Sequence, residues 1–371
     1  MKYYIIAGEA SGDLHGSNLI KALQKIDVDV QIRAWGGDLM EQKGVELVKH
    51  YRYLAFMGFL EVIMNIRTIM KNLSFCKRDI EEFNPDCIIF IDYPGFNLRI
   101  AKWARKKGYQ THYYISPQIW AWKENRIHAI KRDVDKMYVI LPFEKSFYED
   151  KHSYPVEFVG HPLIDAIYSR KQVDEYQFRA ENELSEKPII ALLPGSRKQE
   201  IRKMLEVMLS LVSEFPGHQF VIGGAPGLPK SFYNQYIRNS EVHMVHNKTY
   251  DLLSVATAAV VTSGTATLET ALFKVPEVVC YKGSWLSYQI GKRLVKNIEY
   301  ISLVNLIMDK PVVTELIQNE MNPVRLKQEV GLLLDEFERT RFFMNYYELE
   351  KILGGRGASE KVAELIYNSI N

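Results

Sequence analysis

The chain has 371 residues, of which 47% are hydrophobic and 25% are charged, and these fractions are typical of a globular protein. The length favours two domains, and the formal net charge of +2 is too small to indicate a nucleic-acid-binding protein. The cysteines lack Cys-x-x-Cys spacing, which fits a reducing cytoplasm, and there are three of them, Cys76, Cys87 and Cys280.

The first half of the chain alternates between expected strands and helices. Strands are expected at 3–7, 31–35, 87–92, 110–115, 136–140 and 156–159, and helices at 15–25, 38–43, 60–83, 95–107 and 123–131. This alternation is typical of a parallel, doubly wound α/β sheet. No signal peptide is expected, because the apolar start is short and acids follow it at once.

Residues 7–16, AGEASGDLHG, form the first strand-to-helix turn of this sheet. The glycines do not have the Gly-x-Gly-x-x-Gly spacing of a dinucleotide turn, and the stretch is not a P-loop. Glu9 and Asp13 would repel a pyrophosphate, yet they follow the carboxyl end of a parallel strand, where ligands bind in open α/β sheets. The alternative interpretation is that both acids are N-terminal helix charges, which the helix dipole favours.

Asp92 ends a buried strand in the stretch IIFIDYPGFN. An acid in such a place is costly unless it is paired, and buried acids with shifted pKa values often mark functional sites. The alternative is that Asp92 caps the helix that follows Pro94 and Gly95, where Asn97 is a further candidate cap.

Two segments of the first half indicate a lipid or phosphate partner. The window 54–70 is the most apolar of the chain, but charged and polar residues interrupt it, so it does not qualify as a spanning helix. It is either a buried core helix or a helix that lies in a bilayer surface. The aromatic-rich run 99–132 contains nine Lys or Arg and one acid, Glu124. This excess predicts an anionic partner, a phosphate or an acidic lipid surface, and the alternative is a solvated helix face.

A charged stretch at 169–187 is expected to connect the two domains. A second α/β series follows, with strands expected at 188–193, 218–224, 242–247, 258–264 and 276–282, and residues 283–371 are expected to be mostly helical. The architecture implied is two Rossmann-like halves with a cleft between them. The expected domains are 1–168, 169–340 and a helical segment, 341–371, that packs back on the first domain.

The turn at 192–201, LLPGSRKQEI, is expected to bind phosphate. Gly195 and Ser196 are small, so a phosphate can come close to the free N–H groups at the start of the helix. Arg197 adds a guanidinium that can bind the phosphate through two hydrogen bonds. The alternative is a structural turn with a surface arginine.

The turn at 261–271, VTSGTATLETA, repeats this design. Glu269 lies one turn into its helix, where it is placed to accept from two ribose hydroxyls, and the alternative is a capping box. Two such turns in one half predict a nucleotide diphosphate ligand. The small residues expected around the phosphate in this turn are Ser263, Gly264, Thr265 and Thr267.

No metal or other cofactor is expected. The two Asp-x-Asp patterns, Asp27/Asp29 and Asp133/Asp135, lie away from the phosphate turns and are interpreted as solvated loop acids. No cysteine–histidine cluster indicates zinc. His161, in VGHPLID, is expected in a turn or an interdomain contact.

Together these motifs resemble the lipid A disaccharide synthase family. In order, between residues 4 and 310, they are AGEASGD, LAFMGFLEVI, IDYPGFN, YYISPQIWAWKENRI, LPFEKSFY, FVGHPLID, LLPGSR, SGTATLE and YISLVNLI. The resemblance implies two Rossmann-like domains facing a central cleft, the GT-B glycosyltransferase arrangement. It also implies an inverting, metal-independent transfer of 2,3-diacylglucosamine from its UDP ester to 2,3-diacylglucosamine 1-phosphate (lipid X), which yields lipid A disaccharide 1-phosphate and UDP.

The resemblance also assigns residues. The catalytic acid of the family matches Asp92, and the acid of its first turn matches Glu9. The family arginine on the phosphate side matches Arg197, and the asparagine of its C-terminal domain matches Asn305. We expect Asp92 to be the base for the acceptor 6-hydroxyl, with Glu9 as the alternative base or as an orienting neighbour. Gly95 stands where many relatives carry an acid, which puts acceptor contacts and pKa tuning in doubt.

The family resemblance further implies a cytoplasmic enzyme that is peripheral on the inner face of the cytoplasmic membrane. The contact surface would be 54–70 with the basic run 99–132, and an oligomer is compatible with the sequence. Two other functions remain as alternatives. A soluble UDP-sugar epimerase or hydrolase would need no apolar patch, whereas a nucleotide-sugar-binding module would leave Asp92 and Glu9 unexplained.

Overall fold

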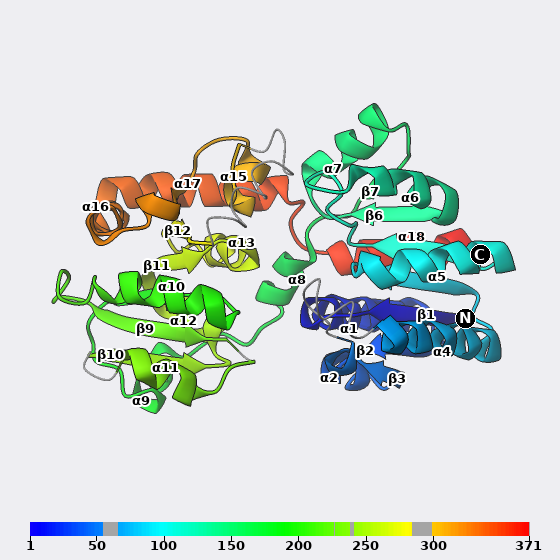
Figure 1. The fold of residues 1–371 in the computed structure, drawn as a ribbon, viewed down its shortest axis with the longest axis horizontal. Helices are drawn as coiled ribbons and strands as arrows, with labels where there is room; N and C mark the ends of the chain where they lie inside the picture. The colour runs from blue at the N-terminus through cyan, green and yellow to red at the C-terminus, as the bar shows by residue number, and fades with distance from the viewer. Residues whose placement is uncertain (55–65, 226, 238–240, 284–298, 371) are drawn as a thin grey trace. The chain divides into compact units, whose positions relative to one another are not determined.

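The computed structural model describes residues 1–54, 66–225, 227–237, 241–283 and 299–370, and the chain forms two compact units (Figure 1). Unit 1 comprises Met1–Ser169 with Leu353–Asn371, and unit 2 comprises Arg170–Ile352. Each unit contains a parallel sheet with helices around it, so the predicted class, two Rossmann-like α/β domains, is confirmed.

Unit 1 contains a seven-stranded parallel sheet in the order β3-β2-β1-β4-β5-β6-β7. The order reverses between β1 and β4, and this switch point is where open α/β sheets bind ligands. The strand at 46–50 was not predicted, because its residues are only half-buried or exposed. The strands are β1 (Lys2–Ala7), β2 (Gln31–Gly36), β3 (Glu46–His50), β4 (Cys87–Ile91), β5 (Gln110–Tyr114), β6 (Lys136–Val139) and β7 (Glu157–Phe158).

Helices pack on this sheet around a core that includes Trp35, Phe90 and Tyr113. The helices described in unit 1 are α1 (Ala10–Ile26), α2 (Asp38–Glu41), η1 (Tyr51–Tyr53), α4 (Ile66–Phe83), α5 (Pro94–Lys107), η2 (Glu124–Arg126), α6 (Ile127–Asp133), α7 (Pro142–Ser146), the π-helical η3 (Phe147–Lys151), α8 (Pro162–Tyr168) and α18 (Ala358–Ile370).

The first helix starts earlier than predicted, at Ala10 instead of residue 15. Two of the three glycines of AGEASGDLHG therefore lie inside α1 and not in the turn. A Cβ on Gly16 would lie 1.8 Å from Met40 Cε, and one on Gly12 would lie 3.0 Å from Ala7 Cβ. These glycines let α1 pack closely on β1 and α2.

Unit 2 contains a six-stranded parallel sheet in the order β10-β9-β8-β11-β12-β13. Its order reverses between β8 and β11. The last strand was not predicted, because 283–371 was expected to be mostly helical. The strands are β8 (Ile189–Leu193), β9 (Gln219–Gly224), β10 (Val242–His246), β11 (Ala256–Thr262), β12 (Glu277–Tyr281) and β13 (Thr314–Ile317).

The helices described in unit 2 are α9 (Glu175–Glu181), α10 (Lys198–Leu209), α11 (Lys230–Ile237), α12 (Thr249–Val255), α13 (Thr265–Leu272), α15 (Leu303–Met308), η4 (Gln318–Glu320), α16 (Pro323–Leu334) and α17 (Glu336–Ile352).

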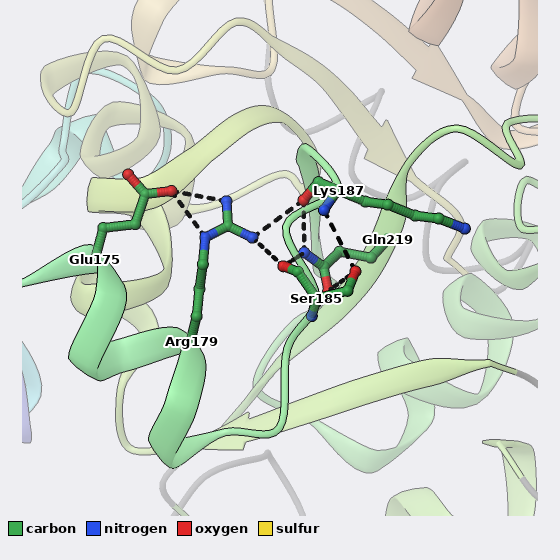
Figure 2. A network of polar contacts seen from close by, with 5 residues as sticks. All are labelled: Glu175, Arg179, Ser185, Lys187 and Gln219. Carbon is green, nitrogen blue, oxygen red and sulfur yellow. Dashed lines mark hydrogen bonds and ion pairs between the residues drawn. The ribbon is translucent and has the colours of Figure 1, made fainter.

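The stretch 169–187 is folded into unit 2 and does not act as a loose connection. Arg179 in α9 is buried, pairs with Glu175 and donates to the carbonyls of Ser185 and Lys187 at 2.5 and 3.1 Å (Figure 2). Gln219 of β9 donates to the same two carbonyls at 2.7 and 2.6 Å. The chain does cross between the units at the start of the predicted connection, after Ser169, and the rest of that stretch is folded into unit 2.

The chain passes from one unit to the other after Ser169 and again after Ile352. Helix α17 lies in unit 2, where Lys274 pairs with Glu350 at 2.5 Å, so the second crossing follows α17 and not residue 340. Helix α18 lies in unit 1, where Asp165 accepts hydrogen bonds from the amides of Gly357 and Ser359 at 2.7 and 2.9 Å.

Most of the apolar window predicted at 54–70 lies outside the described residues, which resume at Ile66 in α4. Across the described parts of the chain, none of the helices is both long enough and apolar enough to span a membrane.

Candidate active site

Asp92 lies at the switch point of the unit 1 sheet, directly after β4. Asp92 and Tyr93 have φ values of 43° and 49°, in the left-handed region that is unfavourable for side-chain-bearing residues. The Asp92 carbonyl accepts hydrogen bonds from Asn97 Nδ2 at 2.7 Å and from Tyr113 Oη at 2.5 Å. These two bonds hold the strained turn, and such strain is characteristic of functional sites.

The environment of Asp92 suits a general base. Burial, followed by the negative charge of Glu9, raises the pKa of Asp92 to about 6, although a Tyr93 backbone hydrogen bond and the charge of Arg126 oppose that rise. A carboxylate with this pKa is ionised at neutral pH and still has useful proton affinity.

Glu9 is exposed at the N-cap of α1, and its side chain makes no capping hydrogen bond. The register pairs Ala7 of β1 with Ile91 of β4, so Glu9 and Asp92 both follow this pair at the same sheet edge. Asp13 is buried instead, and it accepts from the amides of residues 37, 39 and 40 at 2.7–3.1 Å. Asp13 therefore holds the start of α2, and only Glu9 remains available to a ligand.

Asn97 does not cap α5 as the sequence had indicated. It lies inside the helix and donates from Nδ2 to the carbonyls of Ile6, Ile91 and Asp92. Asn97 thus joins the ends of β1 and β4 to the turn that carries Asp92.

Three acids of the two Asp-x-Asp patterns have structural partners in unit 1. Asp27 pairs with the N-terminal amine, Asp133 with Arg132 and Asp135 with Arg105. Asp27 and Asp133 are buried, so the interpretation of all four acids as solvated was wrong. Within the described ranges, no group of three His, Cys, Asp or Glu residues could hold a metal ion.

His161 lies at the N-cap of α8, where its Nδ1 accepts from the Leu163 amide at 3.2 Å. Burial, with a smaller contribution from His15, lowers its pKa to about 3. The ring is therefore neutral and structural, in the turn in which it was predicted.

Unit 2 contains a cavity of about 740 Å³ at its own switch point. Both predicted phosphate turns open into it, the first after β8 and the second after β11. Neither α10 nor α13 has a side-chain cap hydrogen bond. The first-turn amides of α10 and those of Thr265 and Ala266 in α13 remain available to an anion, whereas the Thr267 amide donates to the Gly264 carbonyl at 3.2 Å. The predicted residues that line the cavity are Gly195, Ser196, Arg197, Ser263, Gly264, Thr265 and Glu269.

The first turn depends on Gly195, which has a φ of +105°. A Cβ there would lie 3.0 Å from Glu200 Oε2. Arg197 is largely exposed and pairs with Glu200 at 3.1 Å. Arg197 lines the cavity, and its exposed guanidinium can turn towards an anion bound there.

In the second turn, the hydroxyls support the backbone. Ser263 Oγ donates to the Ile301 carbonyl at 3.0 Å, and Thr267 Oγ1 donates to the Gly264 carbonyl at 2.9 Å. Thr267 is fully buried and is not among the residues that line the cavity, so its side chain shapes the turn from below the cavity wall.

Glu269 lies in the same cavity and accepts a hydrogen bond from Tyr250 Oη at 2.6 Å. Burial raises the pKa of Glu269, whereas the Tyr250 hydrogen bond lowers it. The guanidinium of Arg170 lies 5.1 Å from the Tyr250 ring centre and pairs with Asp251. Sequence reasoning missed Tyr250 and Arg170, since Arg170 fell in the expected connector and Tyr250 in an ordinary helix.

Asn305 does not line the cavity. Its Oδ1 accepts from the amides of Val312 and Val313, and its Nδ2 donates to the Val313 carbonyl and to Glu315. Glu315 in turn accepts from the amides of Ile301 and Ser302 at 2.9 Å. All the hydrogen-bonding capacity of the Asn305 side chain thus goes to the protein, and Glu315 links it to the loop at 301–302 that Ser263 contacts.

Comparisons with known proteins show the family of the chain. The lipid-A-disaccharide synthetase family model matches residues 3–366. A lipid-A-disaccharide synthase of Geobacter metallireducens is 39% identical over 371 residues, which cover 98% of this chain and 95% of the relative. One of Coxiella burnetii (strain CbuG_Q212) is 38% identical over 374 residues, which cover 99% and 98%.

Solved structures show the same fold at low identity. UDP-GlcNAc 2-epimerase from Neisseria meningitidis, bound to UDP-GlcNAc, has a TM-score of 0.70 at 14% identity and covers 99% of this chain and 100% of its own. The S. aureus MnaA–UDP co-structure also has a TM-score of 0.70 at 14% identity, with 100% and 97% covered.

Proposed function

The chain belongs to the lipid-A-disaccharide synthetase family, a family of lipid A biosynthesis glycosyltransferases, and we propose that Asp92 and the unit 2 cavity carry its reaction. The donor is UDP-2,3-diacylglucosamine and the acceptor is 2,3-diacylglucosamine 1-phosphate. The observation that carries the assignment is the strained, half-buried Asp92, whose pKa is raised to about 6 by burial and by Glu9.

In the proposed reaction, Asp92 takes the proton from the acceptor 6-hydroxyl as the oxygen attacks C1 of the donor sugar. The bond from C1 to the diphosphate breaks on the opposite face, so the configuration at C1 inverts and UDP leaves with the electron pair. Glu9 keeps the proton affinity of Asp92 high.

The unit 2 cavity is proposed to bind the UDP part of the donor. The amides of the turns at 195–198 and 263–267, apart from those of Ser263 and Thr267, would stabilise the charge that develops on the leaving diphosphate, together with the guanidinium of Arg197. Glu269 would accept from the ribose hydroxyls, since it is the carboxylate of the second turn that lines the cavity.

The test is transfer by the purified protein, with both substrates and a chelator present and products identified by mass. Asp92→Asn should lower kcat by about 100-fold or more, because general base catalysis contributes about 10²–10⁴-fold. Asp29→Asn, at an exposed position, is the charge-matched control and should keep full activity. If Asp92→Asn retains more than about one tenth of the rate, Asp92 is not the base.

The same assay separates the other functions. Release of UDP without a disaccharide would indicate a hydrolase or an epimerase. UDP binding without any turnover would indicate a nucleotide-sugar-binding module.

We also propose peripheral attachment to the inner face of the cytoplasmic membrane through the basic run 99–132. Exposed cations of α5, Arg99, Lys102 and Lys106, would contact anionic headgroups. Each basic residue near such a surface contributes about 1 kcal/mol. Lys102→Glu with Lys106→Glu should therefore reduce co-sedimentation with anionic phospholipid vesicles and leave binding to neutral vesicles unchanged. Equal sedimentation of both proteins with anionic vesicles would contradict the attachment.

A further inference from the structure

The segment 115–126 leaves the unit 1 sheet directly beside the proposed base. It follows β5, and the amide of Asp92 donates to the Tyr114 carbonyl at 3.2 Å. The segment is attached to α7, because Ser116 Oγ donates to the buried Glu144 at 2.7 Å and the Trp120 ring packs edge-on against Phe143. Residues 116–120 are therefore fixed next to the strand end that contacts Asp92, and residues 121–126 follow them directly.

This segment carries two cations gathered on one aromatic ring. Lys123 Nζ lies 4.2 Å and Arg126 Cζ 5.7 Å from the ring centre of Trp122, whose exposed fraction is 48%. Ring contacts of this kind restrict the side chains but do not neutralise them.

The charges of these two cations are not compensated by acids of the described ranges. Glu124 is the one acid of the run 99–132, and it pairs with Lys151 at 2.7 Å and with His152 at 3.0 Å. Among the residues that the structure describes, no carboxylate forms an ion pair with the side chain of Lys123 or Arg126, since the neighbouring Glu124 is paired elsewhere. Other cations of the run are paired, for example Arg105 with Asp135 and Arg132 with Asp133.

The charge of Arg126 also reaches the reacting edge. Its charge acts on two groups of the Asp92 turn, since it lowers the pKa of both Asp92 and Tyr113 against the stronger effect of burial. Arg126 is half-buried, and its effect on Asp92 acts at a distance, because no ion pair joins these two described residues. A partly desolvated guanidinium without a carboxylate is unfavourable in the free protein and suited to an anionic ligand.

We propose that Arg126, assisted by Lys123, binds the phosphate of the acceptor and so makes the enzyme selective for a phosphorylated acceptor. This inference rests on the proposed function. The phosphate and the reacting 6-hydroxyl belong to one sugar ring, so a cation for the phosphate has to stand near the base without neutralising it. Arg126 meets both conditions, and a guanidinium can bind phosphate through two parallel hydrogen bonds.

The test compares two acceptors, 2,3-diacylglucosamine 1-phosphate and 2,3-diacylglucosamine without the phosphate. Assays are run at about pH 8, where Asp92 is ionised whether or not Arg126 is present, because its pKa is near 6. Arg126→Gln should raise KM for the phosphorylated acceptor by about 10- to 100-fold, which is the contribution expected of a charged hydrogen bond. It should leave kcat/KM for the other acceptor and KM for the donor unchanged.

Controls make the result specific. Arg126→Lys should recover part of the preference for the phosphorylated acceptor that Arg126→Gln loses. Lys123→Gln should raise KM for the phosphorylated acceptor as well, but by less than Arg126→Gln does. Arg78→Gln, at an exposed arginine of α4 to which no role is assigned, should change the kinetics with neither acceptor. A matching urea midpoint for Arg126→Gln and the parent protein would establish that the variant is folded.

Three outcomes would overturn the inference. An equal loss with both acceptors would mean that Arg126 acts on Asp92 alone, and a raised donor KM would assign it to the UDP diphosphate. An unchanged preference for the phosphate would mean that Arg126 does not contact the acceptor. Absence of transfer by the parent protein with either acceptor would instead contradict the proposed function.

Discussion

Tyr250 donates a hydrogen bond of 2.6 Å to Glu269 inside the unit 2 cavity. Burial raises the pKa of Glu269 and this bond opposes the rise, so the tyrosine helps to keep the carboxylate ionised. The phenol itself stays protonated, because burial and the neighbouring carboxylate raise its own pKa. Tyr250 is thus a positioning residue for the carboxylate that we assign to the ribose.

Tyr250→Phe should therefore weaken UDP binding in a pH-dependent way. Only the ionised carboxylate accepts from two hydroxyls, so affinity should fall as the pH drops through the raised pKa of Glu269. Without the phenol, this fall in affinity should start at a higher pH, with a loss of about 5-fold where the two curves differ most, as expected for one hydrogen bond of about 1 kcal/mol. Calorimetric titration with UDP from pH 5 to 8 measures it, and Tyr347→Phe, on the exposed side of α17, is the control. A loss that does not vary with pH would contradict this role.

Replacement of Glu9 by Gln separates its two possible roles. If Asp92 is the base, kcat/KM rises with pH through the Asp92 pKa of about 6. Loss of the Glu9 charge removes one cause of that raised pKa, so the rise of kcat/KM with pH should occur at a lower pH in Glu9→Gln. The maximum value of kcat/KM, reached at higher pH, should stay within about threefold of that of the parent protein. If Glu9 were the base, the plateau itself would fall by about 100-fold or more. Glu41→Gln, at an exposed position in α2, should leave the profile in place.

Gly8 and Gly95 form a matched pair around the Asp92 turn. A Cβ on Gly8 would lie 2.3 Å from Tyr93 Cγ, whereas one on Gly95 meets nothing within 4 Å. Gly8→Ala must displace the Tyr93 ring, so it should lower the free energy of unfolding by about 1–3 kcal/mol and slow transfer. Gly95→Ala lies in the first turn of α5 and should be neutral or stabilising by up to about 1 kcal/mol. Urea denaturation with kcat for each variant checks both, and equal effects would contradict the packing argument.

The central strands of both sheets could be predicted from the sequence because they are continuous apolar runs. CIIFI of β4 and IIALL of β8 are buried throughout, and such runs between turn residues indicate parallel strands. The edge strand β3 has one exposed and four half-buried residues and the edge strand β13 is half-buried at three of its four residues, so neither gave such a signal.

The candidate site was only partly predictable, for a similar reason. Asp92, Gly195 and Glu269 stand at strand ends or helix starts, which local patterns locate. Asp13 and Asn305 have their roles set by backbone groups distant from the motif, in α2 and before β13. No local pattern reveals such partners, so a structural acid and a ligand-facing acid look alike in sequence.

Glu277 gives a prediction about stability instead of catalysis. It starts β12, is fully buried, and neither carboxylate oxygen has a hydrogen-bond partner within the described part of the chain. Burial raises its pKa well above the ordinary value. Glu277 then binds its proton more tightly in the folded than in the unfolded state. Its contribution to stability is therefore greatest below its unfolded pKa of about 4, and this contribution falls as the pH rises towards its folded pKa.

Glu277→Gln removes this dependence because the amide does not ionise. The gain in the free energy of unfolding over the parent protein should grow with pH, by about 1.4 kcal/mol for each pH unit between the two pKa values. Urea denaturation at pH 5, 7 and 9 measures the gain, and Glu336→Gln, exposed at the start of α17, should show none. A difference that is constant over this range would mean that Glu277 ionises equally in both states, and burial would then not control its pKa.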